Sequence, residues 1–105
     1  MTQYNCSVIT PAGRVFADKI NALSATGATG SFGVLGHHAP MVIALTSGPM
    51  TIRQGEHEEF YAVSSGVLEV NRDSDVILMV DSAIKTDTYA EAKTLARQWN
   101  INNRN

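Results

Sequence analysis

The sequence has little of what several functional classes require. Its 105 residues contain one cysteine, Cys6, which excludes an internal disulfide framework and suits a reducing compartment. We expect Cys6 to be a small buried apolar side chain on a strand. Eight basic and ten acidic residues give a net charge of −2 without a basic stripe, so we expect no nucleic-acid partner.

Long apolar runs are also missing. No segment approaches the roughly 20 apolar residues that a membrane-spanning helix needs, and residues 1–16 lack the basic start and apolar core of a signal peptide. The chain is nevertheless 44% hydrophobic, which is too apolar for a disordered tail. We therefore expect a soluble intracellular protein of one domain, with at most a short appendage.

Turn-forming residues recur every 8–12 residues between positions 4 and 80, a spacing typical of the short strands of a sandwich or barrel. A small-residue loop is expected over 26–33, and a hairpin tip over 54–57. The run Val76–Val80 is apolar at every position, so we expect it to lie centrally with both faces covered. Strands are predicted over 4–10, 14–25 (two strands with a break at Asp18-Lys19), 41–45, 50–53, 58–64, 67–70 and 76–80.

After Asp81 the hydrophobic period changes from that of strands to that of a helix. Thr88 and Glu91 have the spacing of a capping box at a helix start, and Asp87 is an alternative start. The tail 100–105 lacks helix formers and is expected to fray. The residues alone thus predict a β-sandwich over 1–85 and a short helix with a frayed tail over 86–105. The apolar stripe of this helix comprises Tyr89, Ala92, Ala96 and Trp99, with Leu95 beside it.

Candidate catalytic or metal-binding patterns are weak. His37, His38 and His57 could in principle hold a zinc ion, but they lack the spacing of known zinc motifs. The glycine-rich stretch 26–33 has no lysine followed by Ser or Thr, so it does not match a phosphate-binding loop. We expect no catalytic residue, metal or cofactor. A zinc enzyme and a small-ligand-binding β-sandwich module remain the alternatives.

Four segments, in order, resemble the epsilon subunit of F-type ATP synthases. Residues 30–41, GSFGVLGHHAPM, are similar to the family signature G-E-F/L-G-I/V-x-P-G-H-A-P-L/M. Residues 64–70, SSGVLEV, resemble S-G-G-x-L-E-V, and residues 80–84, VDSAI, resemble A-D-T/S-A. Residues 10–16, TPAGRVF, match the opening T-P-x-R/G-x-V-F.

This resemblance implies a mainly β protein, a flattened β-sandwich of about ten strands followed by a C-terminal helical part. It implies a non-catalytic subunit of the central stalk that binds the gamma subunit and the ring of c subunits (the c-ring). The subunit would couple ion translocation to ATP synthesis or hydrolysis at the cytoplasmic face of the bacterial inner membrane, or at its organelle equivalent, and would reach the membrane only through the complex. By position, the residues facing the c-ring are Thr29, Gly30, Ser31 and Phe32, those facing gamma are His38, Ala39, Pro40 and Met41, and Tyr89 and Trp99 dock the helix, onto the sandwich or onto gamma.

The chain departs from the family pattern at several positions. Ser31 stands where many members carry an acidic residue, and Gly36-His37 replaces Pro-Gly. The nucleotide-binding motif of some members would fall at 89–94, where Ala90 and Lys93 replace its Asp and Arg, so we expect no ATP binding. The family continues into two helices whereas this sequence has room for one, so we also expect no inhibition by an extended helix.

Overall fold

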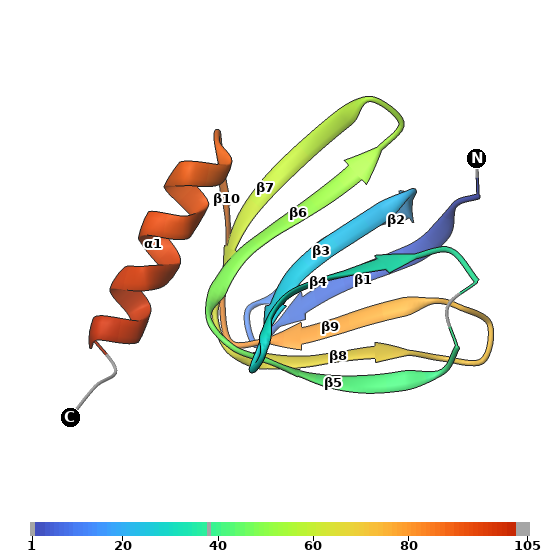
Figure 1. Ribbon diagram of the computed structural model, residues 1–105, viewed down its shortest axis with the longest axis horizontal. Helices are drawn as coiled ribbons and strands as arrows, with labels where there is room; N and C mark the ends of the chain where they lie inside the picture. The colour runs from blue at the N-terminus through green and yellow to red at the C-terminus, as the bar shows by residue number, and fades with distance from the viewer. Residues whose placement is uncertain (1, 38, 103–105) are drawn as a thin grey trace.

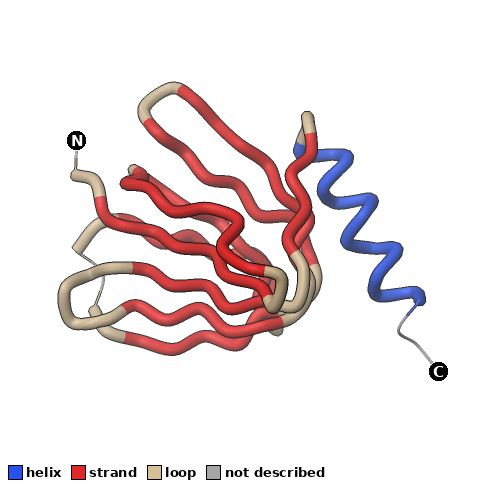
Figure 2. Tube along the Cα trace, turned by 180° about the vertical axis from the view of Figure 1, so that it is seen from behind, coloured by secondary structure: helices blue, strands red, loops and turns tan. Residues whose placement is uncertain are grey.

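Ten strands curl into a flattened sandwich, and one helix packs on the outside of it (Figures 1 and 2). The structure, a computed structural model, describes residues 2–37 and 39–102. The prediction of a β-sandwich of about ten strands followed by one helix is confirmed for these residues. The elements are β1 (Tyr4–Thr10), β2 (Gly13–Ile20), β3 (Ala22–Gly27), β4 (Gly30–Leu35), β5 (Met41–Leu45), β6 (Gly48–Gln54), β7 (His57–Val63), β8 (Gly66–Val70), β9 (Val76–Val80), β10 (Ala83–Thr86) and α1 (Tyr89–Asn102).

The strands form one continuous sheet that folds back on itself into two layers. The hydrogen-bonded order is β10-β7-β6-β3-β5-β8-β9-β1-β2, and β4 pairs only with β3. The two layers are joined where the end of β3 pairs with the end of β5, at the single residue pair Gly27 and Leu45. All neighbouring strands are antiparallel except β1 and β9, which run parallel.

The core lies between the two layers and follows the alternation of each strand. Val8, Leu68 and Leu78 are neighbours on β1, β8 and β9, and each is fully buried. Cys6 is buried beside them, as predicted, with an exposure of 1%. Burial raises the pKa of its thiol to about 12, so the thiol stays protonated at neutral pH.

Two of the predicted boundaries are wrong. The break between β2 and β3 falls at Asn21, and Asp18-Lys19 lies inside β2. Asn21 is buried, and its side-chain oxygen accepts a hydrogen bond from the backbone N–H of Gly55 at 2.6 Å. The chain therefore turns at Asn21 while the buried polar group stays paired. The predicted loop 26–33 is instead a hairpin, because β3 continues to Gly27 and β4 begins at Gly30. Small residues there shorten the turn to two residues rather than lengthening it.

Strand β9 is central in its layer, as predicted, but only one of its faces is covered. Val76, Leu78 and Val80 point inward and are buried, whereas Met79 points outward and is 49% exposed. The expectation that both faces are covered is therefore wrong. Apolar side chains on both faces indicate an open hydrophobic surface on the outer side of this strand.

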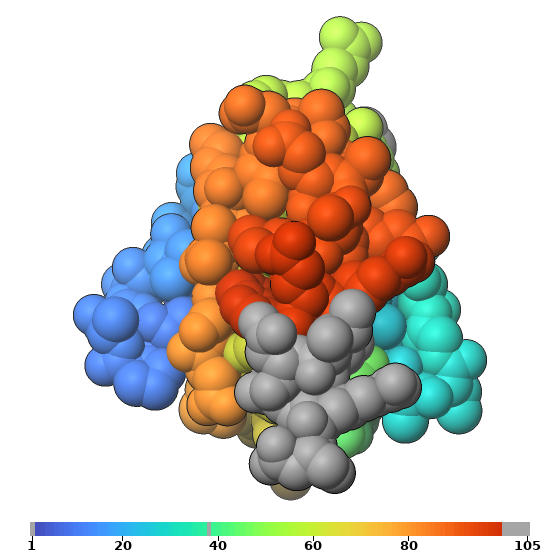
Figure 3. Space-filling view, turned by 90° about the vertical axis from the view of Figure 1, so that its left-hand side faces the viewer, coloured from blue at the N-terminus to red at the C-terminus, as the bar shows by residue number. Residues whose placement is uncertain are grey.

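The helix α1 begins with the predicted capping box. Glu91 N–H donates to the Thr88 hydroxyl oxygen at 3.1 Å, and that hydroxyl donates to the Glu91 carboxylate at 3.2 Å. Ala92 and Ala96 are buried against Ala62 of β7, and Trp99 packs against this cluster. Figure 3 shows the helix lying across the sandwich.

The helix continues to Asn102, so residues 100–102 of the predicted frayed tail form its last turn. Trp99, which is anchored on the sandwich cluster, holds the start of this last turn in place. The remainder of the predicted frayed tail, 103–105, lies outside the described residues.

Candidate partner-binding surfaces

The outer side of the layer β5-β8-β9-β1 carries an uncovered row of apolar side chains. Ala44, Val67, Met79 and Ile9 are successive cross-strand neighbours on this side. Val67 and Met79 are 36% and 49% exposed. Directly beside this row lie Val42, which is 70% exposed, and Ile77. We call these six residues the open face: Ile9, Val42, Ala44, Val67, Ile77 and Met79.

Polar character increases along the strands away from that row. In the next row, Glu69 and Ser7 stand beside Val42 and Ile77. One step further, Asn5 donates a hydrogen bond from its side-chain nitrogen to Asp75 at 3.1 Å. The open face therefore lies toward the end of the sandwich at which β1, β5 and β9 finish and β8 begins.

Five strand connections meet at this end, which we call the link end. The register places the turns after β1, β3, β5, β7 and β9 together, because Gly66 pairs with both Val80 and Leu45, and Leu45 pairs with Gly27. Asp81 carries the only charge among the ten residues that form these connections. The ten are Pro11, Ala12, Ala28, Thr29, Thr46, Ser47, Ser64, Ser65, Asp81 and Ser82.

Hydrogen bonds fasten two of these connections to each other. The backbone N–H of Ser82 donates to the Ser64 hydroxyl oxygen at 2.7 Å, and the Ser64 N–H donates to the Ser82 carbonyl at 3.0 Å. The Asp81 N–H donates to the Ser65 carbonyl at 3.3 Å. The segments 64–70 and 80–84, which are distant in sequence, thus form one rigid corner.

The residues predicted to face the c-ring belong to the β3–β4 hairpin at the link end. Thr29 lies in the turn, and Gly30 and Ser31 begin β4, all three exposed to solvent. Phe32 is half-buried and points back into the sandwich, where it packs against the core. Three of the four residues are therefore free to contact a partner, and the fourth anchors the hairpin.

The residues predicted to face gamma lie at the opposite end of β4 and β5. Ala39 and Pro40 are exposed, and His38 lies outside the described residues. Met41 is half-buried and packs against the core, so its side chain does not face outward. The open face, which sequence reasoning missed, includes Val42, the next residue along. Strand alternation puts Val67 and Met79 on one face, but only the fold shows that nothing in the described chain covers it.

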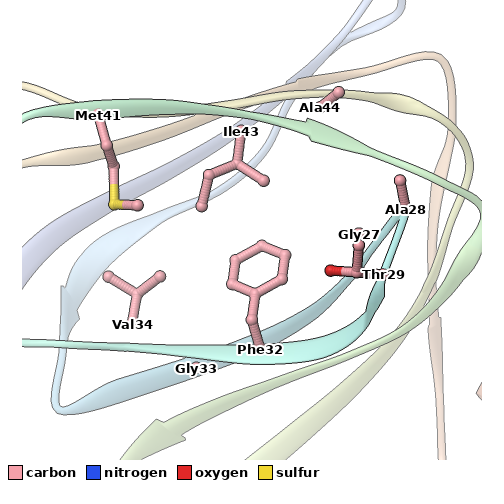
Figure 4. Close-up of a pocket in the computed structure, with 9 residues that line it drawn as sticks. All are labelled: Gly27, Ala28, Thr29, Phe32, Gly33, Val34, Met41, Ile43 and Ala44. Carbon is pink, nitrogen blue, oxygen red and sulfur yellow. The ribbon is translucent and has the colours of Figure 1, made fainter.

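A cavity of about 440 Å³ lies between β4 and β5 and is lined by residues of both predicted sets, Thr29 and Phe32 of the first and Met41 of the second. Figure 4 shows Phe32 on β4 and Ile43 on β5 facing each other across it, with Val34 and Met41 alongside. Thr29 supplies the one polar side chain of the lining. A small-ligand site needs several convergent polar groups, so this cavity does not support the small-ligand alternative.

The two histidines in the described part of the chain, His37 and His57, do not converge on a metal site. His37 adopts a left-handed backbone conformation with φ of 60° in the turn after β4, whereas His57 lies at the start of β7 and its Nε2 is 3.2 Å from the Glu59 carboxylate. Among residues 2–37 and 39–102 there is no group of three or more His, Cys, Asp or Glu side chains arranged to hold a metal ion.

Glu59 is the centre of a small polar cluster at the edge of the sandwich. Tyr61 donates its hydroxyl to Glu59 at 3.0 Å, and Lys85 Nζ lies 3.5 Å from the same carboxylate. Partial burial acts to raise the pKa of Glu59, but the hydrogen bonds from His57 and Tyr61 and the charge of Lys85 outweigh it, so the pKa is lowered overall. Burial and the neighbouring Glu59 raise the pKa of Tyr61. The members of the cluster pair with one another at the edge of the sandwich, which fits a structural role.

The predicted helix residues face the sandwich. Tyr89 is 44% exposed, and its ring meets Phe60 edge to face at 6.5 Å between centroids. Trp99 packs against the Ala62, Ala92 and Ala96 cluster, which places it on the sandwich. Ala90 and Lys93, the positions of the nucleotide motif, are both exposed.

Fold and surface together define a class of protein: a β-sandwich module with a large uncovered apolar sheet face. No helix in the described part of the chain is long and apolar enough to cross a bilayer. The chain belongs to the ATP synthase delta/epsilon chain family, whose β-sandwich domain matches residues 3–86.

Similar proteins carry the same family name. The chain is 36% identical over 92 residues to the ATP synthase epsilon chain of Leptospira borgpetersenii serovar Hardjo-bovis, covering 88% of this chain and 72% of the relative. It is 38% identical over 80 residues to the ATP synthase epsilon chain of Desulforamulus reducens, covering 76% of this chain and 60% of that one. The chain therefore spans between about three fifths and three quarters of these relatives' length.

Two solved structures share the fold. A chain of the Euglena gracilis mitochondrial ATP synthase, from a structure of OSCP, F1 and c-ring, aligns with a TM-score of 0.77 and 20% identity, covering 96% of this chain and 64% of that one. A chain of the Tetrahymena thermophila mitochondrial ATP synthase, from a structure of the central stalk and c-ring, aligns with a TM-score of 0.71 and 14% identity, covering 96% and 92%. At these identities the likeness shows the fold alone.

Proposed function

We propose that this chain is a non-catalytic epsilon-type subunit of the central stalk of a rotary ATP synthase, and that its open face binds the gamma subunit. The observation that carries the proposal is the open face, whose apolar side chains extend across four strands. Val42, Val67 and Met79 keep between 36% and 70% of their surface in water, in a chain whose core is otherwise well covered. A partner that covers the open face would remove that exposure.

The arrangement of apolar and polar side chains suits a permanent interface. Such interfaces bury on the order of 2,000 Å² or more and have apolar centres with polar rims. The open face offers this arrangement, because the apolar row of Val67 and Met79 grades into the polar row of Asn5 and Asp75. The core side chains beneath it, among them Val8, Leu68 and Leu78, are fully buried, and a closely packed interior is stiff, which suits a subunit that transmits torque.

The β3–β4 hairpin is our proposed contact with the c-ring. Thr29, Gly30 and Ser31 project from the link end, and Phe32 fixes the hairpin to the core. In this role the chain rotates with gamma and the ring and couples ion translocation to ATP synthesis or hydrolysis. It is then a peripheral protein at the cytoplasmic face of the bacterial inner membrane, held there only through the complex.

The proposal is tested by measuring how tightly the purified gamma subunit binds the wild-type chain and two matched variants. Met79→Asp places a carboxylate on the open face, and Ile84→Asp places one on β10, where the side chain is 46% exposed. Fully burying a methionine side chain is worth roughly 1.5–3 kcal/mol, and Met79 has about half of its surface left for a partner to bury, so losing that burial alone weakens binding by roughly 3- to 12-fold. Wild type and Ile84→Asp should bind gamma, and Met79→Asp should bind much more weakly. Equal binding by both variants would place the interface elsewhere.

The contact with the c-ring is tested separately. Ser31→Trp adds a bulky side chain to the hairpin without touching the open face. We expect the complex of this variant with gamma to form normally and to attach poorly to isolated c-rings. Normal attachment would remove the hairpin from the ring contact and leave the gamma proposal intact.

A further inference from the structure

A groove of about 340 Å³ lies at the corner where the open face meets the link end. Its walls include Ile9 and Met79 of the open face, and Pro11 and Asp81 of the link end. Gly66 also forms part of the lining. The groove is large enough to take one apolar side chain of a partner.

Asp81 is the unusual member of this corner groove. It carries the only charge in the five connections of the link end and is exposed to solvent. Its backbone is fixed by the hydrogen bond to Ser65, but its carboxylate makes no hydrogen bond or ion pair with any residue in the described part of the chain. The basic residue nearest to this groove in the strand register is Arg14 of β2, which pairs with Ile9 of β1. No ion pair joins Arg14 to Asp81.

An exposed carboxylate at the rim of an apolar groove favours a partner that has a cation next to an apolar side chain. The groove favours an apolar side chain, and a cation next to that side chain gains the charge pair as well. The groove shares Ile9 and Met79 with the open face, so an occupant of that face reaches it without a second binding event.

We propose that the corner groove receives an apolar side chain of the gamma subunit and that Asp81 pairs with an adjacent lysine or arginine of gamma. This inference rests on the proposed function, because it names a specificity-determining residue within the same interface. Asp81 sets the register and the rate of docking, and the apolar row supplies most of the affinity.

The test compares the kinetics of gamma binding for wild type, Asp81→Asn and Glu56→Gln at low and at high salt. Glu56→Gln removes the same charge from the exposed β6–β7 tip at the opposite end of the sandwich. For Asp81→Asn we expect an affinity about 2- to 5-fold lower at low salt, mainly through slower association, and a weaker dependence on salt. Asp81→Lys should lower the affinity further, and Glu56→Gln should leave the kinetics unchanged.

Several outcomes overturn the inference. Unchanged kinetics and salt dependence in Asp81→Asn, or an equal effect of Glu56→Gln, would remove Asp81 from the interface. Sedimentation that shows a wild-type dimer lost in Asp81→Asn would assign the groove to a second copy of this chain. Weaker binding to isolated c-rings with unchanged binding to gamma would assign it to the ring. A wild-type chain that does not bind gamma contradicts the proposed function itself, whereas normal binding with an inert Asp81 contradicts only this inference.

Discussion

β8 and β9 approach each other so closely at Gly66 that no side chain fits there. Replacing Gly66 with alanine tests the packing of the corner at which the open face meets the link end. A Cβ atom at this position would lie 2.2 Å from the Met79 carbonyl oxygen and 2.7 Å from the Val80 Cα. Both atoms belong to the backbone, so no change of rotamer relieves the clash. Reaching an ordinary contact of 3.4 Å means moving β9 by at least 1.2 Å.

Such a displacement also disturbs the hydrogen bonds that follow the two strands. The bond from Asp81 N–H to the Ser65 carbonyl is already 3.3 Å long, and the Ser64 and Ser82 bonds lie directly beyond it. Overpacking typically costs about 1–3 kcal/mol, and the weakened bonds place Gly66→Ala near the upper end of that range. A loss of about 3 kcal/mol lowers the melting temperature of a domain of this size by about 12–24 °C.

Gly33→Ala is the matched control. Gly33 also lies on a strand, and its added Cβ would meet only the Leu23 carbonyl oxygen at 3.8 Å, an ordinary contact. We expect this variant to stay within about 0.5 kcal/mol of wild type, because it adds no clash. Thermal unfolding followed by circular dichroism, with urea unfolding as a second measure, compares the two. If Gly66→Ala melts within about 2 °C of Gly33→Ala, the steric argument is wrong.

Three further substitutions or titrations probe other parts of the fold. Asn21→Ala removes the 2.6 Å hydrogen bond to the Gly55 N–H and should lower the free energy of unfolding by about 1–3 kcal/mol, measured by urea unfolding. An unchanged urea midpoint would show that this hydrogen bond does not stabilise the fold. His37→Gly relieves a residue with φ of 60° and should raise stability by about 0.5–1 kcal/mol; a lower stability would mean that the imidazole itself holds the turn. The lowered pKa of Glu59 means that its contribution to stability is present above the unfolded pKa of about 4.3 and is lost as the pH falls through the lower folded value. Between about pH 5 and pH 3, Glu59→Gln should therefore lose less stability than wild type, and parallel pH profiles would refute the assignment.

The β-sandwich and its helix could be predicted because their signals are local. Turn residues at regular spacing mark most of the strands, and Thr88 with Glu91 marks the start of α1 with the two hydrogen bonds that the structure contains. The hairpin over 26–33 was missed for a related reason. Small residues are typical both of loops and of tight turns, and only the pairing of Ala22–Gly27 with Gly30–Leu35 distinguishes them.

The open face could not be predicted because strand alternation does not show which face is covered. Val67 and Met79 look like core residues in the sequence, and only the folded layers place them outside. The roles of Ser31 toward the c-ring and of Pro40 toward gamma rest on the family resemblance, so they stay predictions. The inward direction of Met41 follows from its position on β5, one residue before the outward Val42.

Methionine oxidation tests the central claim most directly, because the chain contains its own control. Met79 on the open face is 49% exposed, whereas Met50 in the core is 1% exposed. A brief, low-level peroxide pulse followed by mass spectrometry measures both rates in the free chain and in its complex with gamma. We predict that Met79 oxidises quickly when free and is strongly protected by gamma, while Met50 oxidises slowly in both. Equal oxidation of Met79 in the free chain and in a stable gamma complex would contradict binding through the open face.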